Sequence, residues 1–193
     1  MAERLDVVVL KNVRCSFPKY FTPEASVPGG PVKFGGQFII DPDSADGKAN
    51  IKALNAAIKA VAVKAWADKS ERIVAALAED RKCLREGDKA TNGEGDVYDG
   101  YAGMMYVSAS NKKRPQILNR DKTPLAEEDG VIYGGCFVDA VISLYATTKK
   151  EQGGNGLFAS LEIVRFRKDG DSFGAGKVAV DDYLDDLDDD DVI

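Results

Sequence analysis

Aromatic and basic side chains occur side by side at several points of this chain, and together they could hold a flexible polyanion. Lys19 precedes Tyr20, Lys33 precedes Phe34, and Tyr106 lies a few residues before a run of three basic residues. An aromatic ring offers a face for stacking a nucleobase, at roughly 1–3 kcal/mol per base, while a cation neutralises the phosphate backbone. The pattern therefore predicts a surface for single-stranded nucleic acid.

The candidate residues share one property: each is a ring or a cation on a polar strand face, in a loop or at a strand end. They are Lys19, Tyr20, Phe34, Tyr106, Lys112, Lys113, Arg114, Tyr145, Arg165 and Arg167. Side chains alternate between the two faces of a strand, so Tyr106 is expected to share a face with Ser108 and Ser110. Tyr145 is likewise expected opposite the apolar face of its strand. The ordinary alternative for any single ring is core packing, which we expect for Phe17, Phe38 and Phe137.

Residue types that would support catalysis are missing or scattered. The 193 residues include no histidine, which excludes Ser-His and Cys-His nucleophile pairs and histidine metal ligands. Cys15, Cys83 and Cys136 fit neither a disulfide framework nor a zinc spacing. No phosphate-binding loop or dinucleotide-binding glycine pattern is present. We therefore expect a protein that is not an enzyme, with no cofactor and no bound metal.

The acidic residues are concentrated at the C-terminal end. The chain carries 26 Lys+Arg and 32 Asp+Glu, and eight of these aspartates fall in the last thirteen residues. Without these eight the balance is 26 against 24, so the body is mildly basic although the whole chain has a net charge of −6. Repulsion among so many like charges predicts a disordered tail over residues 178–193.

Such a tail could compete with DNA for a basic groove, or bind partner proteins through its end, or serve only to keep the protein soluble. The residues predicted to bind partners are Asp188, Asp189, Asp190, Asp191, Val192 and Ile193. A mildly basic body joined to an acidic tail favours a polyanion-binding surface that competes with a polyanion mimic.

The elements that would position these residues are mostly strands. Alternation and β-branched residues predict strands over 5–17, 33–40, 101–110, 132–148 and 157–167, with a short extended piece over 116–119. Pro18 is expected to end the first strand and to open a loop over 19–31. Helical spacing of apolar residues predicts an insertion at about 48–86, with one helix from Lys48 to Ala65 and a second over 68–85.

This pattern favours a mainly β fold with a helical insertion: a five-stranded OB-type barrel with one or two helices, followed by the disordered acidic tail. Residues 1–177 would form the single-stranded-DNA-binding domain and residues 178–193 the tail. A small α+β sandwich is the alternative. Neither a signal peptide nor an apolar run of membrane-spanning length is evident, so we expect a cytoplasmic protein.

Two blocks of sequence resemble a family of tailed-phage single-stranded-DNA-binding proteins. They are residues 106–112, Tyr-Val-Ser-Ala-Ser-Asn-Lys, and residues 133–145, Tyr-Gly-Gly-Cys-Phe-Val-Asp-Ala-Val-Ile-Ser-Leu-Tyr. The stretch 156–174, which contains Val164-Arg165-Phe166, and the acidic tail are similar in layout. The resemblance implies an OB fold used in phage replication and recombination. It also implies a plan similar to that of the replication protein of short-tailed coliphages, with a helix on the barrel and an acidic C-terminus.

The sequence thus leads to the hypothesis of a non-catalytic, largely sequence-independent single-stranded-DNA-binding protein of a phage. It would act in DNA replication, recombination or repair in the cytoplasm of a bacterial host. Its tail would recruit phage or host replication proteins such as a polymerase or helicase, and it could form a homo-oligomer. The alternatives are a strand-annealing recombination mediator, a metal-dependent nuclease that uses carboxylates of the body, and a protein-interaction module that never touches DNA.

Overall fold

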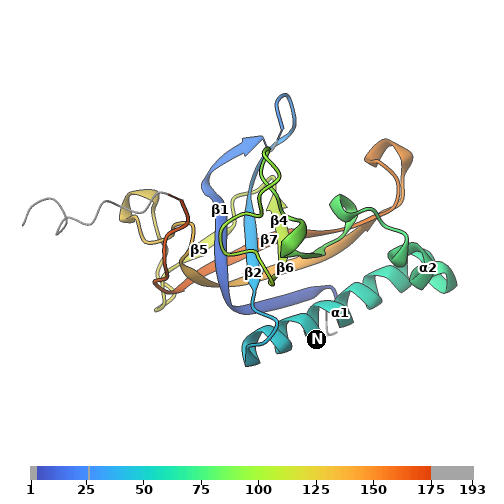
Figure 1. The fold of residues 1–193 in the computed structure, drawn as a ribbon, viewed down its shortest axis with the longest axis horizontal. Coiled ribbons are helices and arrows are strands. Elements are labelled where there is room, and N and C mark those ends of the chain that lie inside the picture. The colour runs from blue at the N-terminus through green and yellow to red at the C-terminus, as the bar shows by residue number, and fades with distance from the viewer. Residues whose placement is uncertain (1–3, 26, 175–193) are drawn as a thin grey trace, which may run out of the picture.

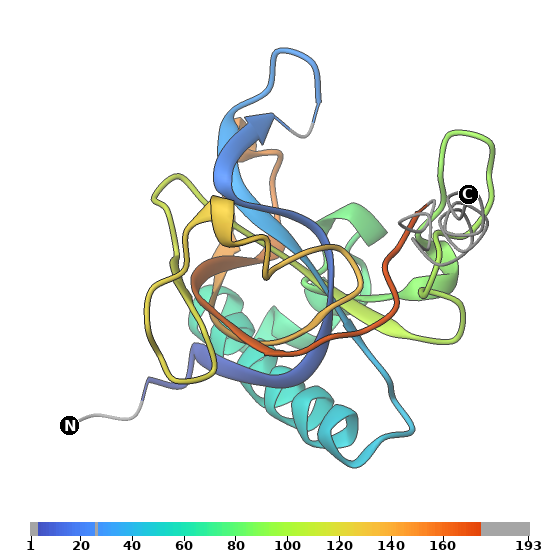
Figure 2. The same ribbon diagram turned by 90° about the vertical axis from the view of Figure 1, so that its left-hand side faces the viewer.

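The computed structural model describes residues 4–25 and 27–174, in which five long strands close into a barrel (Figures 1 and 2). The barrel strands are β1 (Val7–Ala25), β2 (Val32–Ile40), β4 (Met105–Asn111), β6 (Phe137–Thr147) and β7 (Gly156–Lys168). Two short strands, β3 (Leu84–Glu86) and β5 (Gln116–Leu118), extend the sheet beside β4 and β7.

The barrel closes because β4 and β7 meet in parallel at Ala109 and Ala159. All other neighbours around the ring are antiparallel: β4 pairs with β2, β2 with β1, β1 with β6, and β6 with β7. The predicted OB-type barrel with a helical insertion is confirmed.

Strand β6 supplies much of the core. Val138, Ala140, Ile142 and Leu144 alternate along it and are at most 3% exposed, as the sequence pattern predicted. Burying an aliphatic side chain of this size stabilises a fold by about 1.5–3 kcal/mol. The opposite face of the strand carries Tyr145, which is 43% exposed.

Strand β1 is longer than predicted, because Pro18 does not end it. The pairing of β1 with β2 is interrupted between Ser16 and Lys19, so the N–H that Pro18 lacks is not needed there. Asn12 and Phe17 have positive φ values of 52° and 48°. The strand changes direction at these points, which lets one continuous strand pair first with β6 and then with β2.

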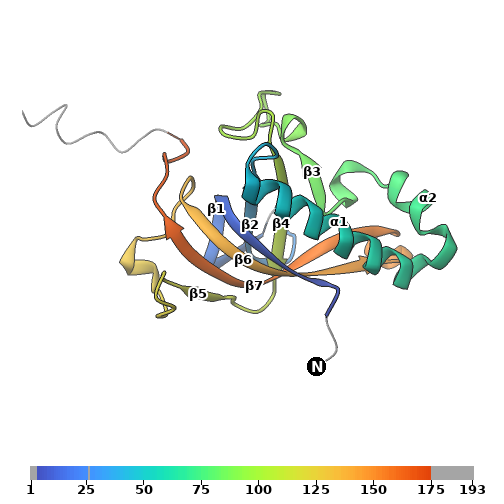
Figure 3. The same ribbon diagram turned by 90° about the horizontal axis from the view of Figure 1, so that it is seen from below.

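The first helix, α1 (Ala45–Trp66), begins three residues before its predicted start. The hydroxyl of Ser44 accepts a hydrogen bond from the backbone N–H of Gly47 at 2.9 Å, which caps the helix N-terminus. The helix lies along the barrel against β1 and β6 (Figure 3). Its Asn50 bonds both the N–H (2.9 Å) and the C=O (2.8 Å) of Lys11, which ties the helix to β1.

The predicted second helix over 68–85 is wrong beyond its first turns. The observed helix α2 covers only Ser70–Ala75, and a 3₁₀ turn at Glu79–Arg81 leads into β3. Ile73, Leu77 and Leu84 are spaced as on a helix, but Leu84 instead lies opposite Val107 of β4. Pairing with an existing strand therefore overrides the helical spacing.

Two predicted strands start too early. Tyr101–Met104 form a turn before β4, and residues 132–136 precede β6 as a loop and turn. The predicted tail, residues 178–193, lies outside the described residues. Among the helices of the described part, none combines the length and apolar character that a membrane crossing requires.

Candidate nucleic-acid interface

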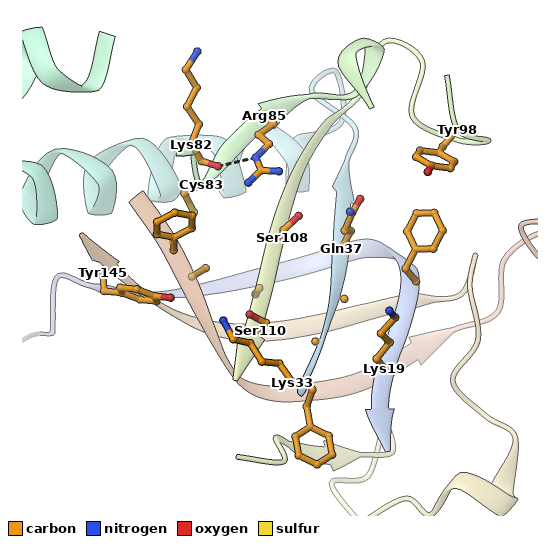
Figure 4. A pocket seen from close by; sticks show the side chains of 17 residues that line it. Lys19, Lys33, Gln37, Lys82, Cys83, Arg85, Tyr98, Ser108, Ser110 and Tyr145 are labelled. Carbon is orange, nitrogen blue, oxygen red and sulfur yellow. Dashed lines mark hydrogen bonds between the residues drawn. The ribbon is translucent and has the colours of Figure 1, made fainter. Parts of the chain in front are cut away.

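An open groove of about 370 Å³ runs over the outer face of the barrel strands (Figure 4). We call it the barrel groove. It is lined by Phe17, Lys19, Lys33, Phe34, Gly35, Gly36, Gln37, Lys82, Cys83, Arg85, Tyr98, Ser108, Ala109, Ser110, Tyr145, Phe158 and Ala159. These residues come from β1, β2, β3, β4, β6 and β7, the segment before β3 and the loop before β4.

The charge of the barrel groove is entirely positive: its charged lining residues are Lys19, Lys33, Lys82 and Arg85. Lys19 and Lys82 contact Glu24 (3.0 Å) and Glu79 (2.5 Å) outside the lining. Exposed pairs of this kind contribute only about 0–1 kcal/mol, so these lysines can exchange a carboxylate for a phosphate at little cost.

The Arg85 side chain is fixed in place. Its guanidinium donates to the carbonyls of Lys82 (2.8 Å) and Asp80 (3.0 Å) and lies 5.9 Å from the centre of the Tyr106 ring. Figure 4 shows this side chain beside Ser108 on the wall of the groove. A cation held in this way needs little reordering to contact a phosphate.

Aromatic rings occupy the two ends of the barrel groove (Figure 4). At one end Phe17 and Tyr98, 44% and 36% exposed, form an edge-to-face pair with centroids 5.1 Å apart. At the other end the ring of Tyr145 packs on that of the half-buried Phe158, with the two ring centroids 5.9 Å apart. Phe34 is also half-buried. Exposed rings next to cations are the combination that base stacking and backbone neutralisation require.

Glycines form the floor between the two ends. A Cβ on Gly35 would come within 2.6 Å of the carbonyl oxygen of Ala109, and one on Gly36 within 2.7 Å of the Tyr20 hydroxyl. The two glycines face opposite sides of β2: Gly36 faces the buried Tyr20 beneath the floor, whereas Gly35 is on the same side of the strand as Gln37 of the groove lining. Neither position has room for a side chain, so at Gly35 the floor stays at the level of the backbone and a base can approach the sheet closely.

Of the ten predicted site residues, the structure places Lys19, Phe34 and Tyr145 in the barrel groove. Tyr20 lies beneath the groove floor instead: it is 1% exposed, and its hydroxyl is 3.2 Å from the Cys15 sulfur. Tyr106 does share its strand face with Ser108, but it is only 7% exposed because Tyr101 and Arg85 pack over it. Neither buried ring is available for stacking.

The predicted basic cluster Lys112, Lys113 and Arg114 lies outside the groove lining, in the exposed connection from β4 to β5. Arg114 stands over the Phe21 ring at 5.3 Å. Because β4 also forms the groove wall, this cluster follows directly on Ser110 and Asn111 and could extend the positive surface.

Arg165 and Arg167 on β7 are bound to an internal partner. The carboxylate of Asp139 accepts hydrogen bonds from Arg165 (2.5 Å) and Arg167 (3.0 Å), and also from the backbone N–H of Asn12 (2.9 Å). Burial by itself would raise the pKa of Asp139, but these hydrogen bonds outweigh it and the pKa is lowered. The two arginines are thus part of the fold here and lie outside the groove.

Sequence reasoning did not select Phe17, Lys82, Arg85 or Tyr98. The sequence predicts Phe17 in the core, whereas its ring is 44% exposed, and its positive φ leaves no signal in the sequence. Lys82 and Arg85 fall within the predicted helix over 68–85, and Tyr98 falls between the predicted elements. Two further lining residues are also missing from the predicted set: Lys33, which precedes Phe34 in the sequence, and Phe158, whose ring packs on Tyr145.

Two titratable side chains of the barrel groove have raised pKa values. Burial raises the pKa of Cys83 to about 12, so its thiol stays protonated at neutral pH. Burial and the nearby Cys83 also raise the pKa of Tyr145. Among the described residues, no group of three or more His, Cys, Asp or Glu side chains is arranged to hold a metal ion.

Comparison with known proteins agrees with this geometry. Residues 6–193 match the family model described as "Enterobacter phage Enc34, ssDNA-binding protein". The chain belongs to this family. A relative, protein p50 of Acyrthosiphon pisum secondary endosymbiont phage 1, is 38% identical over 183 residues, which cover 93% of each chain.

Solved structures similar to this Enc34-family chain are also of phage proteins. The single-stranded DNA-binding protein from bacteriophage Enc34 in complex with ssDNA has a TM-score of 0.71 and 26% identity, over 88% of this chain and 90% of that one. A second structure of the single-stranded DNA-binding protein from bacteriophage Enc34 has a TM-score of 0.68 and 27% identity, over 92% of this chain and 89% of that one. The structure of gp2.5, the single-stranded DNA binding protein encoded by bacteriophage T7, has a TM-score of 0.53 and 14% identity, over 97% of each chain. This similarity supports the fold alone.

Proposed function

We propose that this protein is a non-catalytic, largely sequence-independent single-stranded-DNA-binding protein that acts in phage DNA replication, recombination or repair in the host cytoplasm. The observation that carries the proposal is the barrel groove, which combines four cations and five aromatic rings with no carboxylate in its lining. Membership of the Enc34 family supports it, as does the similar Enc34 protein solved with ssDNA.

In this proposal the DNA backbone follows the cations while bases stack on the rings at the two ends. Lys33 lines the groove and forms no ion pair within the described residues, so it is free to take a phosphate. The groups in the lining able to read base edges are few: chiefly Gln37, Ser108 and Ser110. Stacking dominates over hydrogen bonding, which predicts little sequence preference.

We further propose that the acidic tail competes with DNA and recruits partner proteins. Residues 178–193 carry eight aspartates and no basic residue. The described part of the chain ends at Gly174, which lines a cleft that shares Phe17 and Tyr98 with the barrel groove. The described part of the chain therefore ends close to the positive groove. Displacement of the tail by DNA would then free its end, Asp188–Ile193, to bind a replication protein.

Charge reversal in the groove tests the DNA-binding proposal. Lys33→Glu should weaken binding of an oligo-dT and reduce the slope of log K against log salt by about 0.7, the value for one phosphate contact on a single strand. Lys59→Glu, on the exposed side of α1 and outside the groove lining, is the matched control with the same change in net charge. Equal effects of the two changes would contradict a specific role of the groove.

A further inference from the structure

A second cavity opens beside the barrel groove, past the Phe17–Tyr98 pair. We call it the aromatic cleft. It has a volume of about 380 Å³, and its walls include Phe17, Pro18, Tyr98, Tyr101, Gly134 and Phe173 together with one charged residue, Asp99. Phe17 and Tyr98 line both cavities. A strand lying in the barrel groove therefore meets the cleft at the groove end where it would stack on this pair.

The chain holds Phe17 in an unfavourable backbone conformation in order to present its ring at this point. Its φ of 48° is uncommon for a bulky residue, yet the ring is 44% exposed, so burial does not compensate for the strain. Strain that the rest of the fold maintains is typical of ligand-binding positions. The ring lines both the groove and the cleft, so a ligand in either cavity can contact it.

The far wall of the aromatic cleft is preformed. The guanidinium of Arg14 lies 4.3 Å from the centre of the Phe173 ring and donates to the carbonyls of Gly135 (3.1 Å) and Asp171 (2.7 Å). The backbone N–H of Phe173 donates to the carbonyl of Gly134 at 2.9 Å. These bonds fix the ring and bring a cation beside it, so binding of a ligand costs little conformational entropy at this wall.

We propose that the aromatic cleft is a separate base-binding subsite, which takes one nucleobase of the strand that occupies the barrel groove. This inference rests on the proposed function. Three features favour a base as the occupant: the cleft shares Phe17 and Tyr98 with the groove, four of its nine lining residues are aromatic, and the Arg14 guanidinium stacks on one of these rings, that of Phe173. The volume is within the roughly 300–1,000 Å³ typical of sites for small molecules.

Gly134 offers a way to close the cleft without disturbing the groove. Its φ lies outside the left-handed region, and an added Cβ would meet Phe173 at 3.9 Å and Pro18 at 4.0 Å, which are ordinary contacts. Gly134 lines the cleft and is absent from the groove lining. Gly134→Leu should fill the cleft, while Gly134→Ala adds the same Cβ but leaves most of the space open.

The test measures the affinity of the full chain for oligo-dT of increasing length. The wild-type protein and Gly134→Ala should gain affinity until the cleft is filled. Gly134→Leu should bind the shortest oligomers equally well but should bind longer ones about 5- to 150-fold more weakly, which corresponds to the loss of one stacked base. Fluorescent 2-aminopurine, moved along the oligomer, should be quenched strongly at one position by the wild-type protein and not by Gly134→Leu.

Other outcomes would overturn the inference. Equal affinities of wild-type protein and Gly134→Leu at every length would show that no base enters the cleft. Tighter binding by Gly134→Leu at every length would indicate that a segment of the protein itself, such as the acidic tail, occupies the cleft. Both results leave the proposed function intact, whereas failure of the wild-type protein to bind any oligo-dT would contradict the proposed function itself.

Discussion

Tyr145 is the groove residue whose proposed binding role is simplest to separate from any role in folding. Its ring is 43% exposed, and among the rings of the described residues it packs only on Phe158. Tyr145→Ala should weaken oligo-dT binding by about 1–3 kcal/mol, the value of one stacked base. Tyr145→Phe keeps the ring and should bind almost as the wild type does. Titrations monitored by anisotropy would check both, and a large loss in Tyr145→Phe would show that the hydroxyl, and not stacking, is what matters.

Asp139 illustrates a charged residue that serves the fold. Its pKa is lowered in the folded protein, so its charge stabilises the fold above its unfolded pKa, near 3.8, and this contribution disappears as pH falls through the lower folded value. Asp139→Asn should therefore reduce the free energy of unfolding at pH 7 by about 1.5–3 kcal/mol, as expected for hydrogen bonds to a charged group.

Urea unfolding of Asp139→Asn and wild type at several pH values measures this contribution. The difference between the two proteins should be constant from pH 7 down to about pH 5 and should shrink below the ordinary carboxyl pKa, near 3.8. A difference that stays constant into that acid range would contradict the assignment of a lowered pKa to Asp139.

Residue-level prediction from sequence succeeded where a ring is alone on its strand face and failed where a neighbour covers it. Alternation placed Tyr145 opposite the apolar face of β6, and the structure exposes it. Alternation also placed Tyr106 with Ser108 and put Tyr101 on the opposite face of the predicted strand 101–110. In the structure Tyr101 lies in a turn before β4, and its ring centroid is 5.3 Å from that of Tyr106. Coverage by another segment is a tertiary property that periodicity does not contain.

At the level of elements, Arg81 joins the helical insertion to the β6–β7 connection. Its guanidinium donates to the carbonyls of Gln152 (3.0 Å), Gly154 (2.9 Å) and Asn155 (3.1 Å) and lies 4.9 Å from the centre of the Phe158 ring. The planar guanidinium makes several directed bonds at once, which the ammonium group of a lysine cannot reproduce.

Arg81→Lys and Arg81→Ala should both loosen the β6–β7 connection. Amide hydrogen exchange should become faster at Gly153 and Gly154, whose N–H groups bond to the carbonyls of Lys150 (3.0 Å) and Lys149 (2.9 Å). Exchange in the β1–β2 pairing should not change and is the internal control. Unaltered exchange at both glycines would mean that the connection holds its shape without Arg81.

Elements were predictable where one local pattern dominates. Apolar alternation predicted β6 and β7, and helical spacing predicted α1. Most of the predicted ends of these elements lie within a few residues of the observed ends. The errors arose where long-range pairing competes with local spacing. Leu84 pairs with Val107 across the sheet, and β1 passes through Pro18 because the pairing with β2 is interrupted there.

For the whole molecule, the sequence indicated the barrel because several alternating strands and only one helical insertion exclude a repeated βαβ plan. It could not indicate how the barrel closes, since closure depends on the single parallel pairing of Ala109 with Ala159. The groove has the same limitation. Its lining joins residues from Phe17 to Ala159, which only the closed barrel brings together.

The proposed tail competition is also a property of the whole molecule. Deleting residues 178–193 should tighten oligo-dT binding severalfold at low salt and much less near 0.15 M, where exposed charges are screened beyond about 8 Å. A full-length variant with its eight tail aspartates changed to asparagine separates charge from length and should behave like the deletion. Affinity that is the same with and without the tail at low salt would contradict the competition.

The central claim is that the barrel groove binds single-stranded DNA by stacking and backbone neutralisation. Its most direct test is the anisotropy of a labelled dT oligomer of about 30 nucleotides, titrated at two salt concentrations with duplex DNA as competitor. Oligo-dT cannot pair with itself, so binding reports stacking and backbone contact alone. We predict tight binding that weakens with a log–log salt slope near −0.7 per phosphate contacted and resists duplex competition. No binding at low salt, with the tail present or deleted, would contradict the claim.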